Sequence, residues 1–303
     1  YYTNKARQAG MTLIELTVVL LVLIGLAGLM IPYVGSFVQK TSDSTSSNNL
    51  AQLNNATMRF TVDKNRLPHH LESLINDTAA TVGTATGACV GAVIDEVYCG
   101  LQNNAVFTAT TYAAGTDDIA IASLASSGLE MFVNSNPDTS DKTFNSTTGM
   151  YYLPTQGPAG DGSDEAGIFA VVNAGGAASA RAHLADALGG AGMDYSTTCY
   201  DYIGFGIGDR NELIGNTMTS APVTFPEDAT LGPVQRYGHY IAIVQVDKSN
   251  TASDMMTGAC SEVTEKAKFL GTVMNVPASV NANLMGVGQA LGQAYTNQAA
   301  AGN

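Results

Sequence analysis

The sequence predicts an α+β protein in which a large, mainly antiparallel β head packs on the second half of one long N-terminal helix. Three observations predict this class. An uncharged apolar run lies near the start, a polar stretch with near-helical apolar spacing follows, and the remainder consists of short strand-like segments bounded by turn residues. We expect three divisions: residues 1–10, a long helix over residues 11–63 and a head over residues 64–303.

The first element is an apolar helix. Between Glu15 and Lys40 lie 24 residues without a charge, 16–39. At about 1.5 Å per residue, such a helix exceeds the roughly 30 Å of a bilayer core, so its apolar half is expected to lie in a membrane. Lys5 and Arg7 precede it, and the positive-inside rule then predicts that the head lies outside. A secretory signal peptide is the rival interpretation, but it requires a shorter apolar core followed by a small-residue cleavage site.

The polar stretch extends the helix. Residues 41–49, TSDSTSSNN, suit either a linker or the solvent-facing part of a continued helix. The expected inner stripe beyond them consists of Leu50, Leu53, Met58, Phe60 and Val62. Pro68 ends the pattern.

Short segments of β-branched or aromatic residues, flanked by Gly, Asn or Asp, predict the strands of the head. The expected strands are 150–153, 167–172, 202–207, 239–246 and 269–276, and residues 178–188 form an expected short helix. The glycines of residues 204–209, GFGIGD, are interpreted as turn residues at a strand end, since their spacing does not fit a nucleotide-binding loop.

Charge and motifs restrict the function classes. The net charge is −13, with 26 acidic against 13 basic residues, which disfavours a protein that binds nucleic-acid backbones. Only Glu15 among the carboxylates lies before residue 43. No H-E-x-x-H, G-x-S-x-G or P-loop motif occurs, so the sequence does not favour an enzyme.

Residues 10–16, GMTLIEL, resemble the processing site of type IV pilins and pseudopilins. A basic leader ends in Gly10, the apolar run follows Glu15, and Pro32 and Gly35 stand where that family has its helix-loosening proline. The resemblance covers about residues 5–62, roughly a fifth of the chain.

The resemblance implies cleavage between Gly10 and Met11 by a prepilin peptidase, followed by N-methylation of Met11. Residues 1–10 are then a leader. It also implies that Glu15 neutralises the amine of Met11 on a neighbouring subunit. A buried carboxylate is strongly penalised alone and compensated by an ammonium group, so this pairing makes Glu15 an assembly residue.

The expected function is therefore that of a major pilin, a structural subunit of an extracellular type IV pilus-like filament at the cell surface. The implied partners are other copies of the chain, the prepilin peptidase and the pilus assembly machinery, with the cytoplasmic membrane as the location before assembly. The alternative is a minor pilin or type II secretion pseudopilin acting in adhesion, DNA uptake or protein export. A tethered enzyme or solute-binding module is a third class, for which we identify no site.

Four residues are expected to loosen the helix: Gly25, Gly28, Pro32 and Gly35. Pro32 removes a backbone donor and clashes with the preceding turn, and the glycines are weak helix formers. We expect a kinked helix before assembly and an extended stretch within about residues 24–32 in a filament.

Two further features concern the head. The four cysteines permit three connectivities, of which the sequential one, Cys89–Cys99 and Cys199–Cys260, is the most economical in an exported protein. Asp161, Ser163 and Glu165 place oxygen ligands on alternate positions of a glycine-rich turn, as the start of a calcium loop does. That loop lacks the later glycine and glutamate, and a solvated acidic turn is the alternative. No other cofactor is indicated.

Overall fold

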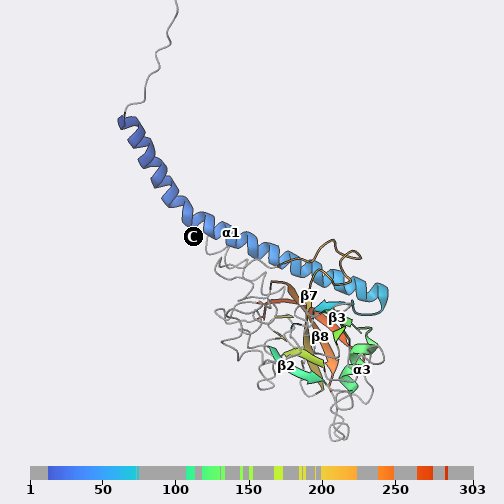
Figure 1. Ribbon diagram of the computed structural model, residues 1–303. Coiled ribbons are helices and arrows are strands. Elements are labelled where there is room, and N and C mark those ends of the chain that lie inside the picture. The colour runs from blue at the N-terminus through green and yellow to red at the C-terminus, as the bar shows by residue number, and fades with distance from the viewer. Residues whose placement is uncertain are drawn as a thin grey trace, which may run out of the picture. The chain divides into compact units, whose positions relative to one another are not determined.

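The computed structural model comprises two units, residues 1–42 and 43–303 (Figure 1). It describes residues 13–72, 74, 107–112, 118–129, 131–133, 144–145, 150–152, 167–172, 184–185, 187–188, 195, 199–223, 238–248, 265–275 and 284–285. The backbone alone is described at positions 29, 31–40, 42, 43, 108, 109, 111, 118, 132, 133, 144, 145, 150–152, 167, 168, 275, 284 and 285.

Helix α1 comprises Leu13–Lys64. Lys64 lies in its last turn, where a cation interacts favourably with the negative end of the helix dipole. Asn65 follows with a φ of 52°, the left-handed conformation that commonly terminates helices. Near this end the Thr61 hydroxyl donates to the Thr57 carbonyl oxygen at 2.8 Å.

The predicted fold class is wrong in its account of the apolar helix. We expected residues 16–39 to cross a membrane, but no helix among the described residues is long and apolar enough to do so. The transmembrane interpretation is therefore abandoned.

The second unit contains a sheet in the order β10-β9-β8-β7-β1-β3-β5-β4, with β6 also pairing β7 and β2 pairing β6. The strands are β1 (Leu71–Glu72), β2 (Phe107–Tyr112), β3 (Met131–Val133), β4 (Phe144–Asn145), β5 (Met150–Tyr152), β6 (Gly167–Val172), β7 (Tyr200–Ile207), β8 (Tyr240–Asp247), β9 (Lys268–Asn275) and β10 (Leu284–Met285). The pairing is antiparallel between the described strands except for the parallel pair β1 and β3.

The five strands expected from the sequence are confirmed as β5, β6, β7, β8 and β9, with bounds that agree within two residues. The expected helix over 178–188 lies mostly outside the described residues. Helix α3, Asp118–Ser126, was not expected.

Strand β7 is the branch point of the sheet. It pairs β8 along its whole length on one edge. Its other edge is divided, because Ile203 and Gly204 pair β6, whereas Gly206 pairs Glu72 of β1. Gly204 and Gly206 therefore lie inside a strand, which corrects their interpretation as turn residues. A Cβ at Gly204 would lie 2.6 Å from Cε1 of Phe107 on β2, so the position of this ring requires glycine here.

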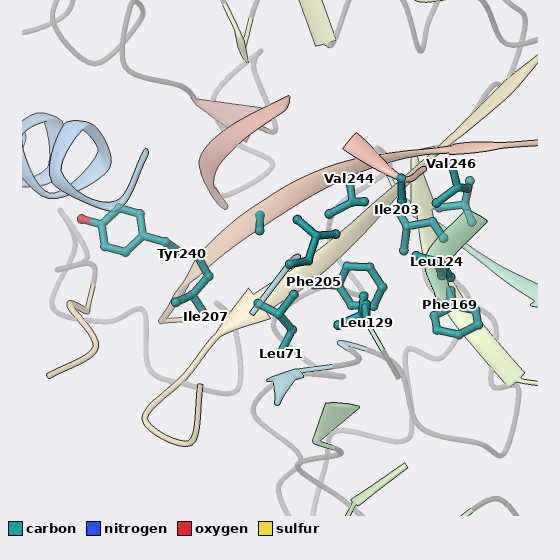
Figure 2. Close-up of a cluster of buried hydrophobic side chains, with 14 of the residues drawn as sticks. Leu71, Leu124, Leu129, Phe169, Ile203, Phe205, Ile207, Tyr240, Val244 and Val246 are labelled. Carbon is teal, nitrogen blue, oxygen red and sulfur yellow. The ribbon is translucent and has the colours of Figure 1, made fainter. Parts of the chain in front are cut away.

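Both faces of the sheet carry buried side chains. Successive side chains of a strand point to opposite faces, and those of the central strands lie in two apolar clusters. Ile203, Phe205 and Val244 lie in one apolar cluster, which Figure 2 shows. Tyr202 and Ile243 lie in the cluster on the other face. The second half of α1 contributes Leu50, Leu53 and Phe60 to the first cluster. Burial on both faces explains why β8 is an almost continuous apolar run.

Candidate functional site

The apolar part of α1 is the largest exposed apolar surface among the described residues. Leu13 is 80% exposed, Leu21 is 73% exposed, and the intervening large apolar side chains are all at least half exposed. Consecutive residues share this exposure, so it surrounds the helix and is not confined to one stripe. Soluble monomers rarely expose contiguous apolar patches larger than a few hundred Å², and larger patches mark interaction sites.

Glu15 lies in the first turn of α1, where the helix dipole favours a negative charge. Two residues later, the Thr17 hydroxyl donates to the Ile14 carbonyl oxygen at 2.9 Å, which satisfies this polar side chain within the apolar segment. Gly10 and Met11, the predicted processing residues, lie outside the described part of the chain.

Gly25 and Gly28 have open space around them. A Cβ built at either residue would meet no heavy atom within 4 Å. Packing against the described residues therefore does not require glycine at these positions. The backbone of α1 is helical through Pro32 and Gly35 in this structure, so the loosening predicted for the four residues remains a prediction about a filament.

The cysteine and calcium predictions fall mostly outside the described residues, which exclude Cys89, Cys99, Cys260, Asp161, Ser163 and Glu165. Cys199 is buried and disulfide-bonded, and its carbonyl oxygen accepts from Lys248 N at 2.8 Å. Cys199 is the one cysteine among the described residues, so its partner and both predicted pairings lie outside them, and no disulfide between described residues is found. In the described ranges, no group of three or more His, Cys, Asp or Glu side chains is arranged to hold a metal ion.

A polar cluster that no sequence pattern indicated follows the end of α1. We name it the Arg66 clamp, consisting of Arg66, His69, Asn211 and Glu212. The guanidinium of Arg66 donates to both carboxylate oxygens of Glu212, at 2.6 and 2.5 Å. It also lies 5.4 Å from the centre of the Phe60 ring. The planar guanidinium fits such a two-bonded pair, so the clamp has a defined geometry.

Backbone bonds complete the clamp. His69 N donates to Glu212 Oε2 at 3.1 Å, and the His69 carbonyl oxygen accepts from Glu212 N at 3.2 Å and Asn211 Nδ2 at 3.3 Å. Burial alone would raise the pKa of Glu212, but the hydrogen bonds from Arg66 and His69 N outweigh burial, so its pKa is lowered. The clamp therefore joins the end of α1 to the loop after β7.

A second carboxylate lies at the far end of β8. Burial raises the pKa of Asp247, whose Oδ2 accepts from Glu265 N at 2.5 Å. Asp247 N donates to the Ser123 hydroxyl of α3 at 3.3 Å. Glu265 pairs with Lys268, and the hydrogen bond raises the pKa of that lysine. These contacts join α3, β8 and the segment before β9. The role of Asp247 is therefore structural.

No protein family profile matches the chain, and no curated protein or solved structure matches it.

Proposed function

We propose that this chain is a type IV pilin-like subunit that polymerises into an extracellular filament through the apolar part of α1. The exposed apolar surface of Leu13–Leu26 carries the proposal, because it lies on consecutive residues around the helix. A helix that is apolar all round is stable only when it is surrounded by apolar groups. Copies of the same helix supply such surroundings in a filament core.

The small residues of this segment support helix–helix packing. Gly25 and Gly28 have no neighbour within 4 Å of a built Cβ, and glycines on an apolar helix allow a second helix to approach closely. Their lack of contacts with the described residues is explained if their partner is another subunit.

Glu15 sets the register in this proposal. Apolar contacts between the α1 helices of neighbouring subunits do little to fix their position along the filament axis, since such contacts are non-directional. A carboxylate in the filament core needs an opposite charge, and the resemblance assigns that role to the Met11 amine of a neighbouring subunit after removal of residues 1–10. The retention of Glu15 favours a subunit that follows others into a filament, and therefore a major pilin over a minor pilin or pseudopilin.

The first test is whether the processed chain forms filaments and which residues they need. We expect the chain from Met11 to sediment as filaments, with Leu20→Lys abolishing them because the lysine charge would be buried in the core. Val62→Lys is the matched control, since Val62 is 84% exposed on the second half of the same helix. A chain that stays monomeric at all concentrations, or Leu20→Lys filaments as abundant as the wild type, would refute the proposal.

The second test concerns Glu15. Glu15→Ala is expected to leave the urea denaturation of the head unchanged, because Glu15 lies in the first unit, and to reduce the filament yield at least tenfold. Electron microscopy of pelleted material measures this yield. Abundant Glu15→Ala filaments with unchanged subunit spacing would remove the residue from the assembly mechanism.

A further inference from the structure

The second half of α1 rests on the sheet through a face that is partly polar. Its buried residues recur every three or four positions and so lie on one side of the helix. They are Ser46, Ser47, Leu50, Leu53, Thr57 and Phe60. Leu50, Leu53 and Phe60 join the apolar cluster on the sheet, whereas the serines and the threonine place hydroxyl groups at the same interface.

Three buried hydroxyls at this interface lack a hydrogen bond to any described residue. They are Ser47 Oγ and Thr57 Oγ1 on α1, and Thr272 Oγ1 on β9. Thr272 pairs with Ala242, which belongs to the cluster that contains Leu50 and Leu53, so its side chain points to the same face as α1. A buried hydroxyl without a partner disfavours the closed interface, because it is solvated when the interface opens.

One direct hydrogen bond joins this part of α1 to the sheet among the described residues. Asn54 Oδ1 accepts from Thr272 N at 2.6 Å. The register of β8 and β9 is irregular beside this bond, since Ile243 pairs Gly271 and Val244 pairs Phe269. Asn54 thus satisfies a backbone donor of β9 just beyond a β-bulge.

The end of the helix is held differently. Directly after α1, the Arg66 clamp provides two charged hydrogen bonds between Arg66 and Glu212 and three bonds to the backbone of His69. Leu67 N also donates to the Ser127 carbonyl oxygen at 2.8 Å. Among the described residues, the segment directly after α1 therefore makes more polar contacts with the head than residues 46–57 do.

We propose that residues 46–57 of α1 form a strap that opens from the sheet, while the Arg66 clamp keeps the end of the helix attached. Opening hydrates the hydroxyls of Ser47, Thr57 and Thr272, breaks the bond between Asn54 and Thr272 N, and uncovers Leu50 and Leu53. The strap is a property of the second unit and does not depend on the proposed filament function. Opening of the strap is a conformational change of the head. It begins at the N-terminal end of the strap and does not extend past Arg66.

Hydrogen exchange of the full chain, followed by mass spectrometry, tests the strap. A helix detached from its packing partner is only marginally stable in water, so we expect amides of residues 47–57 to exchange at least tenfold faster than those of β8. Thr57→Val and Ser47→Ala remove the unbonded hydroxyls at nearly constant shape, and each is expected to slow exchange in residues 47–57 several-fold without changing β8. Asn54→Ala removes the one bond to β9 and is expected to accelerate exchange in the same residues.

Thr61→Val is the matched control, because the Thr61 hydroxyl is bonded to the Thr57 carbonyl oxygen and its loss is not expected to slow exchange. Equal exchange rates in residues 47–57 and β8 would overturn the proposal. So would a Thr57→Val variant with unchanged exchange, which would mean that the hydroxyl is satisfied when closed. Equal slowing in both segments would indicate a global stability change and would also overturn it.

Discussion

Arg66 and Glu212, which are 146 residues apart in the chain, meet through two parallel hydrogen bonds of 2.6 and 2.5 Å. Each side chain is about one quarter exposed, so the pair is partly shielded from solvent. Replacing one partner leaves the other charge partly buried, which costs more than the pair itself contributes.

Glu212→Gln is expected to lower the free energy of unfolding by about 1–2 kcal/mol, since it removes charge-assisted bonds to Arg66 in a partly shielded site. Urea denaturation of the full chain measures this. The control is Asp63→Asn, whose ion pair with Lys64 is largely exposed and is expected to matter by less than about 0.5 kcal/mol. Equal effects of the two substitutions would show that the clamp contributes no more than a surface pair.

The lowered pKa of Glu212 makes this contribution depend on pH. The folded carboxyl holds its proton less tightly than the unfolded one. Its stabilising effect is therefore complete above the ordinary value of 4.5 and is lost as the pH falls through the lower folded pKa. The difference in stability between wild type and Glu212→Gln should be constant from pH 7 to 5 and decrease below that range. A difference that persists undiminished at the acid end would contradict the assignment.

Asp247 is expected to behave with the opposite sign, because burial raises its pKa above the ordinary 3.8. Its folded form holds the proton more tightly, so ionisation at neutral pH destabilises the fold and protonation relieves this as the pH falls. Asp247→Asn keeps an acceptor for Glu265 N. We expect the variant to equal or exceed wild-type stability at pH 7, by at most about 1 kcal/mol, with the advantage decreasing in acid. A large loss at pH 7 would show that the charge itself is needed.

Gly204→Ala tests the packing of β2 over β7. The added methyl group would lie 2.6 Å from Phe107 Cε1 and 3.2 Å from Ile241 Cγ2, both in a buried cluster. We expect a loss of about 1–3 kcal/mol in thermal or urea denaturation, the usual cost of overpacking a core. Gly238→Ala is the control, since no atom lies within 4 Å of its built Cβ, and it should stay within about 0.5 kcal/mol of wild type.

The sequence predicted those elements whose signal is local. Strands such as β6 and β8 are runs of β-branched or aromatic residues with clear ends, and their bounds agree with the structure. Strand β1 has two residues and exists through its pairing with β3 and β7, which local sequence cannot reveal. The glycines of β7 were misread because the reason for Gly204 is Phe107, a distant residue.

The candidate sites also differ in whether the local sequence indicates them. The uncharged run around α1 and Glu15 is visible in the sequence, although its length misled us into expecting a membrane span. The Arg66 clamp was missed, because no pattern links Arg66 to Glu212 across 146 residues. The local signal is a basic residue two positions after the end of a helix, and many surface residues share it.

The last prediction concerns Gly28 and whether its open surroundings are used by another subunit. In the isolated chain no heavy atom lies within 4 Å of a Cβ at Gly28, so Gly28→Leu should be accommodated and should increase local helix stability by up to about 1 kcal/mol. In a filament core, small residues allow neighbouring helices to approach, and a leucine at such a contact would force them apart. We therefore expect Gly28→Leu to raise the critical concentration for polymerisation at least tenfold, which corresponds to about 1.4 kcal/mol per subunit. Asn55→Leu adds the same side chain at an exposed position of the second half of α1 and should change that concentration little. Sedimentation across a concentration series gives both values, and Gly28→Leu filaments with wild-type critical concentration and rise would show that no neighbouring helix packs against this glycine.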